Sequence, residues 1–342
     1  MLAYKEIKES LLSNQHTWLI TGVAGFIGSN ILETLLNLNQ KVVGLDNFMT
    51  GNEENLLKVR NSITNKNNWK NFTLLTGDIC NFDDCKLACK DIEYVLHQAA
   101  LGSVPRSLAD PIATNINNIN GFLNMLTASR DAQVSSFTYA ASSSSYGDHP
   151  DLPKVESKIG KPLSPYAVTK YVNELYADVF ATNFDFKSIG LRYFNIYGPH
   201  QDPLGAYAAV IPIWIDSMLN NKEIYINGNG DTSRDFTFVD NAVQANILSA
   251  VASDDAKNEV YNIACGSRTS LVEMFEILRD VFGSHGQLYS QDPVFRNFRK
   301  GDVLHSLADI SKAKDKLGYA PTHDFHQGIT ETIEWFFKKI KL

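Results

Sequence analysis

The segment Thr17–Gly28, which reads TWLITGVAGFIG, is the feature that most constrains what this chain can fold into. Its apolar first half predicts a buried strand, and the spacing of apolar residues in Phe26–Leu38 predicts a helix directly after it. Between them, Gly22, Gly25 and Gly28 allow a tight turn, close approach of a pyrophosphate and close packing of helix on strand. The segment therefore predicts a phosphate-binding turn, although its first glycine gap is one residue longer than in the common dinucleotide pattern.

A second predicted strand, Lys41–Leu45, runs into Asp46, at the usual distance for a carboxylate that binds the adenosine ribose. A carboxylate there favours two ribose hydroxyls and repels a 2′-phosphate, and no arginine follows, because the next residues are Asn47 and Phe48. These residues predict NAD rather than NADP. The alternative is that Asp46 is an ordinary turn residue.

Strands and helices alternate through the first half of the chain, which predicts a parallel sheet. A helix is predicted over Ile112–Arg130, and further strands over 72–76, 94–97 and 137–141. We therefore predict an α/β fold with a Rossmann-type doubly wound parallel sheet. Asp78, after the third strand, is predicted to reach the adenine amino group, and Ala99 and Ala100 leave room for the ribose.

The alternation breaks after Asn195 into loops rich in glycine and proline, which predicts a smaller α/β substrate lobe interleaved with the sheet. A helix over Val210–Leu219 and a strand within Glu223–Gly228 belong to this lobe, whereas Asp240–Val251 and Glu259–Ala264 return to the sheet. The predicted divisions are a helical extension (1–16), a NAD-binding domain (17–195 and 236–264) and a substrate-binding domain (196–235 and 265–342).

Charge and composition exclude several classes of partner. The net charge of −7 and the lack of a basic run argue against nucleic acid or an anionic membrane surface. No apolar run approaches the length of a membrane span, and residues 1–16 lack the apolar core of a secretory signal. The cysteines, which show no Cys-x-x-Cys spacing, predict free thiols, no metal site and a cytoplasmic location; they are Cys80, Cys85, Cys89 and Cys265.

The stretch SPYAVTK at 164–170 begins a predicted helix, with Ser164 as N-cap. Tyr166 and Lys170 stand one turn apart on one face of it. Because an ammonium favours a phenolate, Lys170 is predicted to lower the pKa of Tyr166 toward working pH. Such a pair is often merely structural, but here it follows a dinucleotide-binding pattern and the serines Ser142–Ser145, which predicts a hydride-transfer site.

Together these motifs resemble the extended short-chain dehydrogenase/reductase family and, within it, the nucleotide-sugar 4-epimerases. The resemblance covers nearly all of residues 17–340. It also rests on Asp78-Ile79, Arg192-Tyr193-Phe194-Asn195, Arg234-Asp235-Phe236 and Arg299-Lys300-Gly301-Asp302. The stretches AASSS at 140–144 and GAYAAV at 205–210 are most similar to the UDP-N-acetylglucosamine 4-epimerase group of bacterial surface polysaccharide synthesis.

The resemblance implies a tightly bound NAD and three catalytic residues. Tyr166 would be the base, Lys170 would hold the nicotinamide ribose, and Ser142 would bind the sugar 4-OH. The implied cofactor contacts are Gly22, Gly25, Phe26, Ile27, Gly28, Asp46, Asn47, Asp78, Ile79, Gln98, Ala99, Ala100, Asn118, Tyr166, Lys170 and Phe194. The implied substrate contacts are Gly102, Ser103, Ser142, Ser143, Ser144, Tyr166, Asn195, Ala209, Val210, Tyr225, Asn227, Arg234, Arg299, Asp302 and Ser306.

The implied reaction interconverts UDP-N-acetylglucosamine and UDP-N-acetylgalactosamine by C4 epimerisation through a transient 4-keto sugar. Ser306 and Ala209 are expected to leave room for the 2-acetamido group, whereas a tyrosine in place of Ser306 would clash with it. The alternatives are a 4-epimerase of UDP-glucose or UDP-glucuronic acid, a nucleotide-sugar 4,6-dehydratase, an oxidoreductase that releases NADH, and an NAD-sensing regulator. A dehydratase is disfavoured because Ser143 and Ser144 stand where dehydratases carry acids.

Two further expectations concern assembly and the histidines. By resemblance, Ile112–Arg130 and Pro165–Thr182 would form a homodimer through a four-helix bundle. Because Tyr166 already supplies the base, we interpret the histidines as packing or surface residues; those considered are His97, His149, His200 and His305. His200 and Leu304 depart from the resemblance, since arginines are usual near both positions.

Overall fold

The computed structural model describes residues 3–203, 205, 208–298 and 304–340. Its centre is a seven-stranded parallel sheet with the order β11-β6-β5-β4-β1-β2-β3. The strands are β1 (Thr17–Thr21), β2 (Lys41–Asp46), β3 (Phe72–Thr76), β4 (Tyr94–His97), β5 (Ser136–Ser142), β6 (Ile189–Tyr193) and β11 (Glu259–Ile263). The strand order reverses between β1 and β4, and such a reversal opens a crevice at the carboxyl ends of the strands. The predicted doubly wound sheet is confirmed.

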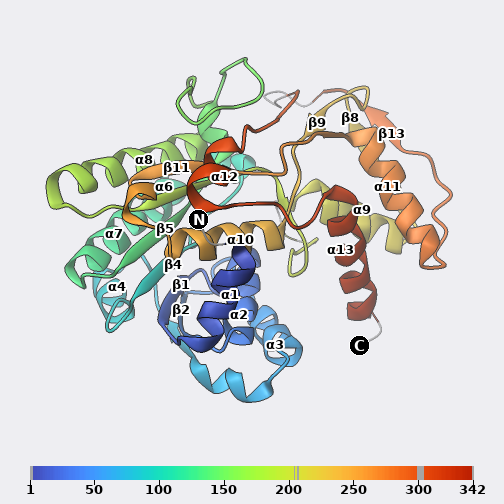
Figure 1. Cartoon of the computed structure of the whole chain (residues 1–342). Coiled ribbons are helices and arrows are strands. Elements are labelled where there is room, and N and C mark those ends of the chain that lie inside the picture. The colour runs from blue at the N-terminus through green and yellow to red at the C-terminus, as the bar shows by residue number, and fades with distance from the viewer. Residues whose placement is uncertain (1–2, 204, 206–207, 299–303, 341–342) are drawn as a thin grey trace.

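Helices cover both faces of this sheet (Figure 1). One buried layer gathers apolar side chains of β1 together with α2 (Phe26–Asn37), α3 (Glu53–Ser62) and α10 (Val239–Ala250). The other gathers those of β4 and β5 with α4 (Phe82–Ala88), α7 (Gly121–Asp131) and α8 (Pro165–Phe184). Strands buried on both faces explain the near-continuous apolar runs of the sequence.

The predicted helix over 112–130 is not one regular helix. It consists of α6 (Pro111–Asn115), a π-turn η2 (Ile116–Asn120) and α7. Asn118 lies in the π-turn, where its side chain accepts from the Leu101 N–H at 2.7 Å and donates to the Leu101 carbonyl at 3.0 Å. The π-turn therefore contains the residue that is hydrogen-bonded to the loop after β4. Such turns often occur at functional sites.

The second half of the chain leaves the sheet after β6. Its helices are α9 (Val210–Leu219), α11 (Leu271–Ser284), α12 (Ser311–Leu317) and α13 (Phe325–Ile340), which agrees with the helix predicted over 210–219. Its short strands pair as β7 (Ile196–Tyr197) with β10 (Thr237–Phe238), β8 (Tyr225–Asn227) with β13 (Val294–Arg296), and β9 (Ser233–Arg234) with β12 (Thr269–Ser270).

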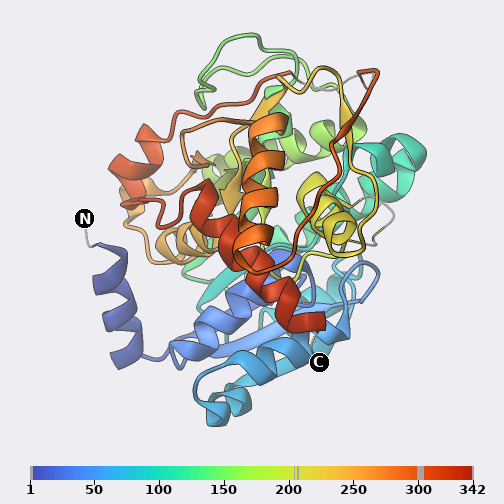
Figure 2. The ribbon, with the colours of Figure 1, turned by 90° about the vertical axis from the view of Figure 1, so that its right-hand side faces the viewer.

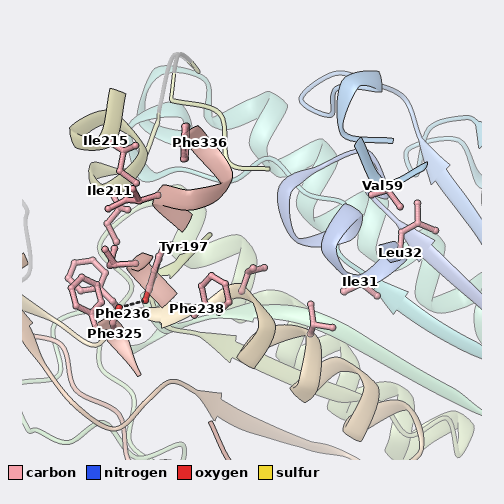
Figure 3. Close-up of a cluster of buried hydrophobic side chains, with 14 of the residues drawn as sticks. Ile31, Leu32, Val59, Tyr197, Ile211, Ile215, Phe236, Phe238, Phe325 and Phe336 are labelled. Carbon is pink, nitrogen blue, oxygen red and sulfur yellow. Dashed lines mark hydrogen bonds between the residues drawn. The ribbon is translucent and has the colours of Figure 1, made fainter. Parts of the chain in front are cut away.

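A buried aromatic cluster holds this second half together (Figure 3). Tyr197 packs against Phe236, Phe238 and Phe325, with ring centroids 5.5 to 6.4 Å apart. The Tyr197 hydroxyl also donates to the Phe325 carbonyl at 3.0 Å, so a buried polar atom is satisfied. The same apolar cluster continues into α2 and α3, where Figure 3 places Ile31, Leu32 and Val59. The two halves therefore share one core.

The remaining helices are short or peripheral. They are α1 (Tyr4–Ser13), α5 (Val104–Ala109), η1 (Lys66–Asn71), η3 (Ser143–Tyr146) and η4 (Asp254–Ala256). Helix α1 buries Leu11 and packs against α10, which confirms the predicted N-terminal helix; Figure 2 shows it at one side of the molecule. Among the described residues, no helix is both long enough and apolar enough to cross a lipid bilayer. The proposed division into domains stays a prediction.

Candidate active site

A cavity of about 660 Å³ opens at the carboxyl ends of the central strands, where the strand order reverses. It brings together most of the predicted cofactor and substrate residues. Those that line it are Gly22, Gly25, Phe26, Ile27, Gly28, Asp46, Asn47, Ile79, Gln98, Ala99, Ala100, Gly102, Ser103, Ser142, Ser143, Tyr166, Lys170, Asn195 and Ala209. Residues from eight separate chain segments therefore converge on one cavity.

The glycine turn fits a dinucleotide closely. Gly22 has a φ of +69°, and a Cβ atom there would lie 2.9 Å from the Ala99 backbone. A Cβ atom on Gly28 would lie 2.1 Å from the Gly22 carbonyl oxygen. The turn can keep this shape only with glycine at both positions, and it presents the amino end of α2 to the cavity. This geometry fits the pyrophosphate of NAD.

Asp46 ends β2 at the edge of the same turn and is 7% exposed. Its two carboxylate oxygens accept from the backbone N–H groups of Ala24 and Phe48, both at 2.8 Å. A carboxylate fixed in this way borders the cavity beside the glycines, where a ribose that carries free hydroxyls would find an acceptor. The residues present therefore fit NAD at its adenosine end.

Ser142, Tyr166 and Lys170 meet where β5 ends beside the amino end of α8. Ser164 caps that helix by accepting from the Ala167 N–H at 3.1 Å, which fixes Tyr166 in its first turn. The Lys170 ammonium donates to the Ala140 carbonyl at 2.7 Å and lies 6.0 Å from the centre of the Tyr166 ring. The Ser142 hydroxyl accepts from the Ser144 hydroxyl at 2.8 Å. These contacts hold a phenol, a hydroxyl and an ammonium around one part of the cavity.

The prediction that Tyr166 has a lowered pKa is wrong for this structure. Burial raises the pKa of Tyr166, and its hydrogen bond with Ser142 only partly opposes that rise. Burial also lowers the pKa of the Lys170 ammonium, to about 8. The sequence shows the charge of Lys170, but it does not show that both side chains are buried, which disfavours the charged form of each. A positive charge bound in the cavity would favour the phenolate.

One wall of the cavity is assembled from the second half of the chain. Asn195 lines this wall, with a φ of +41°, and its side-chain amide donates to the Asp235 carbonyl at 2.9 Å and to the Ser306 hydroxyl at 3.4 Å. Ala209 lines the same wall at the start of α9. Ser306 itself does not line the cavity, but it stands directly behind Asn195.

Several predicted site residues lie elsewhere. Described residues that do not line the cavity are Asp78, Asn118, Ser144, Phe194, Val210, Tyr225, Asn227, Arg234 and Ser306. The Asp78 carboxylate accepts from the Cys80 N–H and the Asn47 side chain, and these hydrogen bonds help to lower its pKa although burial acts in the opposite direction. Arg299 and Asp302 fall outside the described residues. The roles given to all of these residues stay predictions.

Tyr225 and Arg234 have structural contacts in place of the expected ligand contacts. Tyr225 is 37% exposed, and the Arg296 guanidinium stacks 3.1 Å from the centre of its ring. Arg234 donates to the backbone carbonyls of Ser233 and Leu304 at 3.1 and 3.0 Å. Both residues belong to short strand pairs in the second half of the chain.

Several residues of the cavity were missed from the sequence, among them Arg106 and Gln201. Arg106, on α5, lines the cavity beside Ser103, whose hydroxyl caps that helix. Gln201 also lines the cavity; its side chain donates weakly to the Ile196 carbonyl at 3.3 Å, and its buried carbonyl oxygen has no hydrogen-bond partner in the described structure. Because this oxygen is buried, other atoms of Gln201 form its part of the cavity wall. No local motif indicates a role for Gln201, although it follows His200, which departs from the family resemblance.

The histidines have packing contacts, as interpreted from the sequence. His97 is buried in the sheet and exchanges a 2.8 Å hydrogen bond with Thr21, and burial lowers its pKa to about 3. His200 is 5% exposed and pairs with Ser29 at 2.8 Å. His305 pairs with Ser233 at 2.9 Å. None of these three lines the cavity.

Comparison with known proteins agrees with this site. The model of the NAD dependent epimerase/dehydratase family matches residues 18–264, and the chain belongs to that family. A UDP-N-acetylglucosamine 4-epimerase from Methanobrevibacter ruminantium M1, solved with UDP-N-acetylmuramic acid, superposes with a TM-score of 0.86 at 38% identity, over 95% of this chain and 99% of that one. The cofactor of the family is NAD, as the glycine turn and Asp46 predicted.

The names of two further relatives refer to UDP-glucose. A UDP-glucose 4-epimerase from Thermotoga maritima, solved with UDP-glucose, superposes with a TM-score of 0.85 at 34% identity, over 95% of this chain and 99% of that one. A putative UDP-glucose 4-epimerase from Methanocaldococcus jannaschii is 36% identical over 93% of this chain and 97% of its own length. The relatives thus agree on nucleotide-sugar 4-epimerisation and differ in the hexose.

Proposed function

We propose that this protein interconverts UDP-N-acetylglucosamine and UDP-N-acetylgalactosamine by C4 epimerisation, with NAD held throughout the cycle. The observation that carries the proposal is the single cavity in which Ser142, Tyr166 and Lys170 lie between the glycine turn and the wall of Asn195 and Ala209. A hydride acceptor and a sugar bound at these two sides would meet at the phenol. Proximity of this kind supplies a large part of enzymatic acceleration.

The N-acetylated sugar is favoured by the small residues of the second wall. Ala209 borders the cavity, and behind Asn195 stands Ser306, which offers a short hydroxyl where a bulky side chain would push into the hexose region. The named similarity to a UDP-N-acetylglucosamine 4-epimerase, at 38% identity, supports the same choice. UDP-glucose is the second candidate, because two comparably similar relatives carry that name.

In the proposed reaction the side chains move one proton and orient one sugar. Ser142 hydrogen-bonds the sugar 4-OH, and Tyr166 takes its proton as C4 is oxidised to a 4-keto sugar. NAD, held by the glycine turn and Asp46, would supply a reversible hydride acceptor and a positive charge that favours ionisation of the buried Tyr166. The keto sugar then turns over within the cavity, and Tyr166 returns the proton after reduction on the opposite face.

The residues also argue against a dehydratase. Elimination of water from C5 and C6 requires an acid and a base at the sugar, and the described residues after Ser142 are Ser143 and Ser144, which are neither. Of these, Ser143 lines the cavity. With serines at these positions, the segment after Ser142 lacks the acids that a dehydratase carries there, which favours reduction of the 4-keto sugar.

Incubation with UDP-N-acetylglucosamine followed by proton NMR tests the proposal. We expect the anomeric and H4 signals of UDP-N-acetylgalactosamine to grow until a stable ratio is reached, with no reduced cofactor released. Formation of a 6-deoxy-4-keto sugar would establish the dehydratase, and NADH in solution an oxidoreductase. Turnover of UDP-glucose with none of the N-acetylated sugar would move the assignment to the second candidate. No conversion of any UDP-sugar would favour an NAD-sensing regulator.

We also propose a homodimer formed through α8 and the segment that contains α6. Both present exposed apolar side chains, which are Ile112, Ile116, Val168, Leu175 and Val179, each at least 43% exposed. Such a face is costly in water and is typical of a surface that packs against a second copy. A monomer at micromolar concentration in analytical ultracentrifugation would contradict this. The free thiols of the chain support a reducing, cytoplasmic location.

A further inference from the structure

His200 occupies an unusual place behind the substrate wall of the cavity. It lies in the turn after β7 with a φ of +70°, a left-handed conformation that costs a residue with a Cβ atom free energy. The side chain is nevertheless 5% exposed, so the turn is held firmly against the rest of the molecule. A strained residue persists only where the surrounding contacts determine its conformation.

The contacts that hold His200 come from both halves of the chain. Its Nδ1 lies 2.8 Å from the hydroxyl of Ser29, in α2, and the neighbouring Asn30 donates to the Pro199 carbonyl at 3.0 Å. The other side of the imidazole packs on Trp335 of α13, with ring centroids 5.5 Å apart. Lys58 of α3 lies 5.4 Å from the centre of the same Trp335 ring. We call Ser29, Asn30, His200 and Trp335 the His200 clasp.

The His200 clasp connects the two sides of the cavity. Ser29 directly follows Gly28, which lines the cavity on the dinucleotide side. Gln201 directly follows His200, and it lines the cavity on the substrate side together with Asp202 and Ala209. Two hydrogen bonds, one between Ser29 and His200 and one from Asn30 to Pro199, therefore join the helix that fits the pyrophosphate to the chain segment that begins the sugar wall. Burial lowers the pKa of His200 to about 4, so the imidazole in this bond is neutral.

We propose that His200 is a positioning residue, which fixes Gln201 and the wall that follows it at a set distance from the dinucleotide helix α2. Its imidazole does not touch the cavity and takes no part in proton transfer. The clasp acts through Gln201, which directly follows His200 and lines the cavity. The inference rests on the proposed function only for the identity of the substrate. It requires a dinucleotide on one side of the cavity and a ligand on the other, but not a particular hexose.

Kinetics of His200→Ala test the proposal. We expect the KM for UDP-N-acetylglucosamine to rise about tenfold, while kcat and the amount of bound NAD change less than threefold, since a misplaced wall weakens sugar binding without touching the phenol. Ser29→Ala should raise KM in the same direction, and the double variant should be no worse than His200→Ala alone. His200→Asn, which tolerates the left-handed backbone, should recover part of the loss. A KM within twofold of the unaltered protein in His200→Ala would overturn the proposal.

His285→Ala is the matched control. His285 stacks on Phe337 of the same helix, α13, with ring centroids 5.6 Å apart, but it does not line or adjoin the cavity. We expect its KM to stay within twofold of the unaltered value. An equal rise in KM for both histidine variants would mean that loosening α13 anywhere has this effect, which would also overturn a specific role for His200.

Amide hydrogen exchange separates failure of the clasp from failure of the proposed function. In His200→Ala, the exchange rates at Gln201 and Asp202 should rise at least tenfold while those of α2 and the central strands stay unchanged. This readout needs no substrate, so it holds even if UDP-N-acetylglucosamine is not turned over. Unchanged exchange at Gln201 would refute the clasp. If His200→Ala does not fold, Ser29→Ala carries the same test.

Discussion

The two sides of the cavity are built in different ways. The dinucleotide side consists of backbone at the ends of β1, β2 and β4, which the parallel sheet brings together. Its shape depends on the lack of a side chain at Gly22 and Gly28. The substrate side consists of side chains from distant segments, such as Asn195 and Ala209, held by contacts behind the wall. The dinucleotide side leaves no room for a Cβ atom at Gly22 or Gly28, whereas the substrate side is supported by residues, such as Ser306, that do not line the cavity.

Substitution of Tyr166 should have the largest effect, because both sides of the cavity converge on it. Tyr166→Phe removes the proton acceptor and should lower kcat about 10³-fold, with UDP-sugar and NAD binding retained. Steady-state kinetics together with measurement of bound NAD would check this. Tyr146, buried in the neighbouring η3 and bonded to Asn262 at 2.6 Å, is a suitable control position for loss of a phenol outside the cavity. Epimerisation at an undiminished rate in Tyr166→Phe would contradict the proposed chemistry.

A methyl group on the dinucleotide side should be nearly as damaging. In Gly28→Ala the new Cβ atom would meet the Gly22 carbonyl oxygen at 2.1 Å, so the turn must open. We expect NAD affinity to fall about 10²-fold, measured by cofactor retention after gel filtration, with activity lost in parallel. Gly283→Ala is the matched control, because a Cβ atom there meets no atom within 4 Å and α11 is helical. Full NAD retention in Gly28→Ala would show that this side does tolerate an added atom.

A bulky residue on the substrate side should change selectivity and leave the dinucleotide side intact. Ser306→Tyr is expected to lower kcat/KM for UDP-N-acetylglucosamine about tenfold relative to UDP-glucose, because the ring would press on Asn195 from behind and narrow the hexose region. Bound NAD should be unchanged. Ser306→Ala, which removes only a 3.4 Å hydrogen bond, should alter the selectivity ratio less than threefold. An unchanged ratio in Ser306→Tyr would remove Ser306 from the account of specificity.

The smallest expected effect is the dependence of the His200 clasp on pH. Burial and, to a smaller extent, Lys58 lower the pKa of His200 to about 4, below the value of about 6.5 in an unfolded chain. The unfolded state therefore binds more protons between these values, and stability falls as pH falls. Relative to His200→Gln, the unaltered protein should lose about 1 kcal/mol of unfolding free energy between pH 7.5 and 5.5, measured with urea. His97 shifts in the same direction and Asp235 in the opposite one, and both cancel in the difference. A constant difference would show that His200 is not held neutral by the fold.

Much of the fold and of the dinucleotide side could be predicted from the sequence. The strands, the glycine turn and Asp46 follow from local patterns, because backbone geometry and burial impose them within a few residues. The π-turn at Asn118 could not be predicted, since it depends on a tether to Leu101, seventeen residues earlier. The pKa of Tyr166 was predicted with the wrong sign, because one neighbouring charge was visible in the sequence and the burial of the whole pair was not.

The sequence by itself determined a Rossmann-type sheet, an NAD turn and a Tyr-x-x-x-Lys pair, all of them features that lie within one turn or one strand–helix unit. Only the tertiary structure decided that Gln201 lines the cavity, that Asn195 hydrogen-bonds Ser306, and that His200 bonds to Ser29, 171 residues away. The physical reason is how far apart in the sequence the interacting residues lie. Phosphate binding by a backbone turn is a local property, whereas the shape of a sugar pocket is set by packing between segments that meet only in the folded chain.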